Sequence, residues 1–180
     1  EKDFMLLYAG YFKINPFPEG FKESPLIIRS IVSEETKLSF AIEGDDETIL
    51  KVQLKQSLNP GETIRVTLDF TLTIPHMYGR FGWHENIIAL ARWYPLLSVL
   101  DDKGWHNNPF YPFHRPFFSD AADYAVTLDI PSGYVVIHTG EKERETPAAG
   151  ERIIYDVKTS APVRDFALAL CPDYKVLETS

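Results

Sequence analysis

The chain has 180 residues, of which 44% are hydrophobic, and a formal net charge of −8. This length supports one sizeable core without disulfides or a structural metal, and the hydrophobic content excludes a disordered chain. The acidic charge, without a strongly basic cluster, argues against a nucleic-acid partner, and the lack of an apolar run of about 18 residues excludes a membrane-spanning helix in this sequence.

We interpret residues 1–180 as a single domain, excised as an N-terminal fragment from a longer protein. The sequence begins at Glu1 and runs directly into apolar residues. Cys171 is the only cysteine, so an intrachain disulfide is excluded and the cysteine content indicates no compartment.

Alternation with a period of two predicts strands along most of the first 75 residues, because successive side chains of a strand point to opposite faces. The β-branched stretch 25–32 is followed by alternating stretches at 37–43, 48–54 and 62–75. The last of these predicts a strand of about a dozen residues, and it places on one face Ile64, Val66, Leu68, Phe70, Leu72 and Ile74.

Residues 122–170 return to the same pattern. Strands are predicted at 123–130, 133–139, 152–157 and 164–170, with turns between them at 131–133 and 147–151. Many short strands at spacings of about 8 to 12 residues are typical of an all-β sandwich or barrel, and we predict an antiparallel β-sandwich.

Residues 75–120 form the exception, because they show no regular period and are far longer than a usual connection. We predict a long irregular crossover, rich in aromatic residues and proline. Aromatic residues are enriched in interfaces, so we predict a contact surface for a partner outside the chain; a loop packed over the end of the sandwich is the alternative. The predicted interface rings are Trp93, Tyr94, Trp105, Phe110, Tyr111, Phe113, Phe117 and Phe118.

The sequence shows no complete catalytic or metal-binding motif. Residues 84–88 read HENII, and a zinc peptidase motif would need a second histidine where Ile88 stands. The spacing of the five histidines fits no recognised metal-ligand pattern. Cys171 stands at the end of a predicted strand, where we expect a buried thiol that packs as a small hydrophobic residue. We therefore predict no catalytic residue, no metal ligand and no cofactor in this chain.

Four stretches resemble, in the right order, the N-terminal domain of the aminopeptidase-N-like zinc metallopeptidases, the gluzincins. They are residues 57–75 (a Pro-Gly-Glu turn before a long strand), 90–113 (the aromatic and proline-rich core), 119–141 (a hairpin) and 163–178 (a final strand). The resemblance implies a saddle-like β-sandwich that packs against a downstream catalytic domain of the same chain, where zinc is expected and a peptide substrate is cleaved.

The resemblance also implies a residue that holds the substrate's amino group. Family members that are aminopeptidases draw a Gln or Glu for this purpose from a position shortly before the aromatic-proline core. Counting back from Tyr94 places Asn86 there, with Glu85 beside it; a turn-capping role for Asn86 is the alternative.

Two other hypotheses remain open. A free-standing module could bind carbohydrate or peptide on its aromatic residues. A small metalloenzyme built on the histidines would carry stoichiometric zinc.

Overall fold

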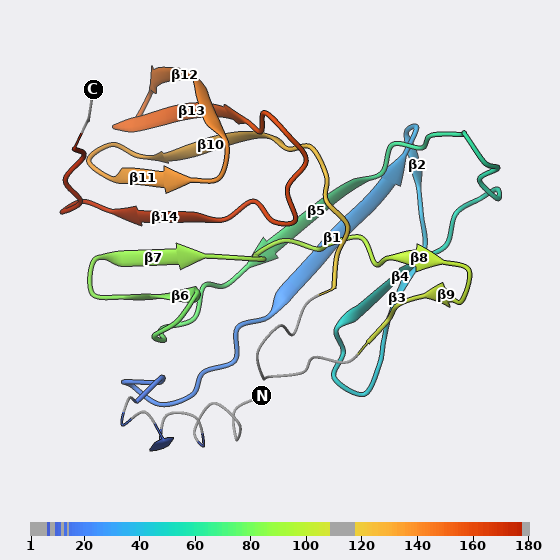
Figure 1. The fold of residues 1–180 in the computed structure, drawn as a ribbon, viewed down its shortest axis with the longest axis horizontal. Coiled ribbons are helices and arrows are strands. Elements are labelled where there is room, and N and C mark those ends of the chain that lie inside the picture. Colours follow the sequence, from blue (N-terminus) through green and yellow to red (C-terminus); the bar gives the residue numbers. More distant parts are fainter. Residues whose placement is uncertain (1–6, 8–9, 12, 14, 109–117, 178–180) are drawn as a thin grey trace. The chain divides into compact units, whose positions relative to one another are not determined.

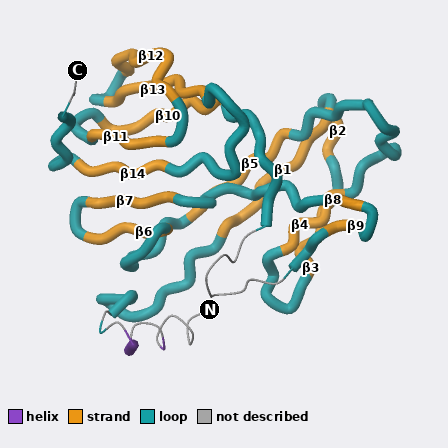
Figure 2. The backbone as a smooth tube through the Cα atoms, in the orientation of Figure 1, coloured by secondary structure: helices purple, strands orange, loops and turns teal. Residues whose placement is uncertain are grey.

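The computed structural model describes residues 7, 10–11, 13, 15–108 and 118–177. Strands joined by loops make up nearly all of this part of the chain, and every paired strand in a sheet is antiparallel (Figures 1 and 2). The predicted all-β class is confirmed.

The chain folds into two compact units. The first unit comprises the described residues of Glu1–Lys22, Ile74–Leu97 and Ser119–Ser180, and the second those of Glu23–Thr73 and Ser98–Phe118. Each unit is assembled from separate stretches of chain, so no single linker in the sequence marks a boundary. The expectation of a single domain was drawn from the length of the chain.

Two sheets form the first unit (Figure 1). The three-stranded sheet has the order β10 (Ala125–Pro131), β13 (Arg152–Lys158), β12 (Glu141–Ala148). The four-stranded sheet has the order β11 (Val135–His138), β14 (Leu168–Cys171), β7 (Ile87–Leu90), β6 (Phe81–His84).

One hydrophobic core joins these two sheets into a sandwich-like arrangement. Leu128 and Val157 come from the three-stranded sheet, and Leu90, Leu168 and Leu170 come from the four-stranded sheet. The sixth buried member, Phe166, precedes β14 and is 1% exposed. In β10 and β14 the core residues alternate with more exposed ones, as the period-two pattern of the sequence predicted.

The second unit contains β1 (Leu26–Ser33), which pairs with β2 (Thr36–Lys37) on one side and with β5 (Thr67–Leu72) on the other. Two hairpins complete it: β3 (Phe40–Glu43) with β4 (Ile49–Val52), and β8 (Leu100–Asp101) with β9 (Gly104–Trp105). Ile31 in the middle of β1 is fully buried.

Three expectations about elements were wrong. The alternating stretch 62–75 contains a strand of six residues, since β1 offers partners only to Thr67–Leu72. The stretch 75–120 is not irregular throughout, because its described part holds β6, β7, β8 and β9. β12 was missed, because its residues EKERETPA are almost all exposed and show no apolar alternation.

Candidate functional site

The four-stranded sheet of the first unit turns one face to the core and the other away from it. Leu90 and Leu168 pair across β7 and β14 and lie in the core. Their neighbours Ala89 and Ala169 also pair, and alternation places these two on the opposite face. Small residues therefore occupy the centre of the face that the core does not use.

This small-residue character extends across the sheet. Ala169 pairs with Ile137 on one side, and Ala89 pairs with Gly82 on the other, so one row crosses all four strands. A depression of about 410 Å³ lies over this region; its lining residues are Arg80, Ala89, Leu90, Ala91, Ile137, His138, Thr139, Ala167, Leu168 and Ala169. We call Ala89, Ala91, Ala167, Ala169 and Ile137 the alanine face.

The alanine face is apolar, and its four alanines are half-buried. Ile137 is 58% exposed, although it is β-branched and lies inside a strand. Methyl side chains let another polypeptide approach the sheet closely, so this face is a candidate docking surface. Its chemistry suits contact with a protein surface rather than acid–base catalysis.

The predicted amine-binding residues lie at the turn between β6 and β7, at the edge of the same sheet. Glu85 is exposed and has a positive φ of 50°. The side-chain amide of Asn86 donates a hydrogen bond to the Asp173 carboxylate, Nδ2 to Oδ2 3.0 Å. Asn86 is thus oriented by a residue 87 positions later, and the turn presents carboxylate and amide oxygens, which accept hydrogen bonds from ammonium groups.

Trp93 and Tyr94, the first two predicted interface rings, pack against the core of the first unit. The Trp93 indole N–H donates to the carbonyl of Phe166 (3.1 Å), and the Tyr94 hydroxyl accepts from the Phe166 N–H (2.9 Å). The same hydroxyl lies 3.3 Å from Asp165 Oδ1, to which it donates. Burial, more than any neighbouring group, raises the pKa of Tyr94, so its hydroxyl stays neutral.

Trp105 and Phe118, in the second unit, are each 56% exposed. Trp105 pairs with the exposed Leu100 across the β8–β9 hairpin. Phe118 lies edge-on to His106, with ring centroids 5.2 Å apart, and His106 Nε2 is 2.7 Å from Asp101 Oδ2. The other four predicted rings, Phe110, Tyr111, Phe113 and Phe117, lie outside the described residues.

A stacked ring cluster in the first unit was not recognised from the sequence. His76 lies on Trp83 (centroids 4.0 Å apart) and 5.5 Å from His84, which in turn contacts Tyr78 at 3.9 Å. The concentration of histidines in residues 75–120 was the available signal, but their spacing gave no hint that β6 and the preceding turn bring them together. Within the described part of the chain, no group of three or more His, Cys, Asp or Glu side chains is placed to hold a metal ion.

No helix among the described residues has the length and apolar character needed to cross a membrane. Comparison with family models, with curated proteins and with solved structures finds no match for this chain.

Proposed function

We propose that this chain is the non-catalytic, N-terminal β-domain of a zinc metallopeptidase of the aminopeptidase-N-like type. In this role it scaffolds a downstream catalytic domain of the same protein and forms one wall of its substrate cleft. The observation that carries the proposal is the apolar alanine face, which the four-stranded sheet presents away from the core, near the turn with Glu85 and Asn86.

The alanine face supports a docking role because the depression over it has an apolar lining and small side chains. Burying such a surface against a partner is favourable by roughly 25 cal/mol per Å² of apolar area, and alanine loses no rotamer entropy on docking. The order of the four family-like stretches indicates which partner this is, namely the catalytic domain that follows in the family.

In this proposal Glu85 and Asn86 bind the amino group of the peptide substrate. An amide oxygen and a carboxylate accept hydrogen bonds from the protonated amino group of a peptide, and a charged donor makes such bonds stronger. Asp173 fixes the Asn86 amide, which limits the ordering cost when a substrate binds. Zinc and peptide hydrolysis belong, in this proposal, to the downstream domain.

The reading frame beyond Ser180 provides the first test. We expect an H-E-x-x-H motif within about a hundred residues, because two histidines one helical turn apart place both rings on one zinc ion. A frame that continues without this motif would contradict the proposal.

A charge placed on the alanine face provides the second test. Ala169→Glu should weaken binding of the chain to the separately produced downstream region by at least about tenfold, since the carboxylate is desolvated without a partner. Ala161→Glu, at an exposed loop position of the same unit, is the matched control and should bind normally. Equal binding by both variants, measured by calorimetry, would remove the alanine face from the interface.

A second candidate function rests on the exposed Trp105 ring. An open indole on a hairpin is suited to stack on a sugar or on a peptide side chain, as a free-standing binding module requires. This function predicts binding in a glycan array or in calorimetry with peptides, without any partner domain, and loss of that binding in Trp105→Ala. Binding that is unchanged by the substitution would exclude this ring as the site.

A further inference from the structure

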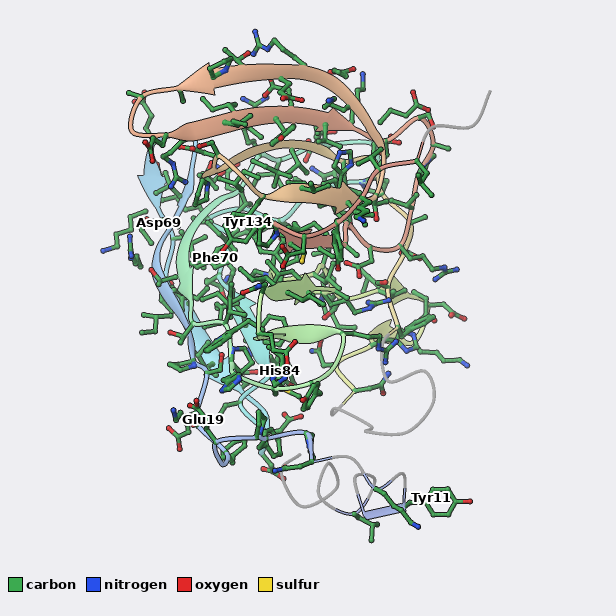
Figure 3. All side chains as sticks on the ribbon, turned by 90° about the vertical axis from the view of Figure 1, so that its left-hand side faces the viewer. Tyr11, Glu19, Asp69, Phe70, His84 and Tyr134 are labelled. Carbon is green, nitrogen blue, oxygen red and sulfur yellow. The ribbon has the colours of Figure 1, made fainter. Side chains whose placement is uncertain are left out.

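The strand β12 forms an edge of the three-stranded sheet in the first unit. Among the described strands it pairs only with β13, and no backbone group of the described residues bonds to its other side. In Figures 1 and 3 it is the uppermost strand, and side chains that end in nitrogen or oxygen line it. A long open edge of this kind is a template on which a strand of another chain can pair.

The register with β13 places two charged side chains of β12 on the side of the sheet that faces the core. Lys142 pairs with Val157, which is 2% exposed and belongs to the core. Glu145 pairs with Tyr155, which packs against the core. Residues directly opposite each other in an antiparallel pair project to the same face, so Lys142 and Glu145 also project to the core side. Their side chains are 49% and 42% exposed, which places them at the margin of the sandwich.

These two side chains form an ion pair, and we call them the edge pair. The Lys142 ammonium lies 2.6 Å from Glu145 Oε2 and 5.8 Å from the centroid of the Tyr155 ring. The hydrogen bond to Glu145, more than any other group, raises the pKa of Lys142, so the ammonium stays charged. The edge pair therefore holds two full charges beside apolar side chains, at a place that water still reaches.

Two backbone features also make this edge a poor partner for another strand. The register shifts between Lys142 and Arg144, so Glu143 has no partner on β13. A bulge of this kind bends the strand and increases its twist. Pro147 has no N–H, and for this reason proline occurs in sheets only on edge strands, at strand starts or at bulges. A strand added here would meet a bent edge that is short of one donor.

We propose that the edge pair, with the bulge at Glu143 and with Pro147, keeps β12 from pairing with a strand of a second copy of this chain. An added strand would cover the edge pair, and charges taken out of water lose hydration that one ion pair does not restore. Charges on the outward face, such as Arg144 with 71% of its side chain exposed, would keep their contact with water. This role concerns the three-stranded sheet, so it goes beyond the proposed function and does not depend on it.

Removal of the edge pair tests the proposal. Lys142→Thr combined with Glu145→Thr leaves the net charge unchanged and introduces residues that favour strands. We expect this double variant of the 180-residue chain to self-associate at least about tenfold more tightly than the unaltered chain, as measured by analytical ultracentrifugation over a range of concentrations. The backbone amides of β12 should gain protection from hydrogen exchange as the concentration rises, because the added strand bonds to them.

Two further double variants serve as controls. Glu141→Thr with Arg144→Thr also removes one charge of each sign from β12, but from the outward face, as the partners of these residues on β13 show. This variant should associate no more tightly than the unaltered chain. Lys142→Glu with Glu145→Lys exchanges the two charges and keeps an ion pair on the core side, so it should behave in the same way.

Three results would overturn the proposal. The first is self-association of the threonine edge-pair variant that is no tighter than that of the outward-face control. The second is association that leaves the β12 amides unprotected, because another surface would then be the interface. The third is loss of the strand signal in circular dichroism of the threonine variant, which would make the edge pair a requirement of the fold. We expect the fold to be retained, since a partly exposed ion pair contributes little to stability.

Discussion

At the scale of single residues, two neighbouring rings secure the backbone of a residue more than 70 positions later. The Trp93 indole N–H donates a hydrogen bond to the carbonyl of Phe166, and the Tyr94 hydroxyl accepts one from the Phe166 N–H. Both are backbone groups of Phe166, which is 1% exposed, and buried backbone groups need a partner when water is excluded. The two rings thus combine apolar packing with the hydrogen bonds that the Phe166 peptide requires.

Tyr94→Phe should therefore destabilise the chain by about 1 to 3 kcal/mol, the cost of leaving the buried Phe166 N–H without an acceptor. Urea unfolding followed by tryptophan fluorescence measures the change. Tyr174→Phe is the control: its hydroxyl makes no hydrogen bond within the described part of the chain, and its removal should have little effect. A Tyr94 variant as stable as the Tyr174 variant would show that the hydroxyl is dispensable.

The sequence identified residues 93–118 as rich in rings but did not distinguish rings that enter the core from rings that stay exposed. That distinction depends on partners far away in the sequence. Trp93 and Tyr94 form hydrogen bonds with the backbone of Phe166, whereas Trp105 lies on a two-residue strand opposite Leu100. Asn86 is a similar case. Resemblance selected the position, but only the fold shows that Asp173 orients its amide.

At the scale of elements, alternation predicted the strands whose sequences alternate between apolar and polar residues, and it failed where the sequence lacks that pattern. β10 and β13 pair over seven residues in register and were readily predicted. β12 was missed because it pairs with β13 while exposing nearly all its side chains, so backbone hydrogen bonds hold it without an apolar signal. β6 and β7 were missed because their sequences, FGWH and IIAL, do not alternate between apolar and polar residues.

The turns between strands allow a second prediction, because two of their glycines differ in a single respect. Gly133 has a φ of 93° and open space where a Cβ would stand, whereas Gly140 has a φ of 89° and would place a Cβ 2.7 Å from the Lys158 carbonyl oxygen. Alanine at either position adopts an unfavourable backbone, at a cost of about 1 to 2 kcal/mol. Only Gly140→Ala must also move the backbone of a neighbouring strand end.

We expect Gly140→Ala to lose roughly 1 to 3 kcal/mol more stability than Gly133→Ala, as overpacking against backbone does. Urea unfolding of both variants gives the difference directly, with the shared positive-φ cost cancelling. Equal losses of stability in the two variants would mean that the backbone at Lys158 moves away from the added methyl group at no cost in free energy.

At the scale of the whole molecule, the described residues form two units, and each unit consists of segments that are not contiguous in the sequence. All residues of the large core cluster belong to the first unit, while Ile31, Leu38 and Val99 are buried in the second. Each unit therefore has apolar residues of its own to bury, and local stability follows local burial.

This arrangement predicts that core truncations act first on their own unit. Ile31→Ala and Phe166→Ala remove side chains that are 0% and 1% exposed, and each should destabilise its unit by about 2 to 5 kcal/mol. Hydrogen exchange resolved by residue should show lost protection in β1 and β5 for Ile31→Ala, and in β13 and β14 for Phe166→Ala. If either substitution lowered protection equally in both sets of strands, the two units would unfold as one cooperative body, and the chain would be a single domain in the energetic sense despite its two cores.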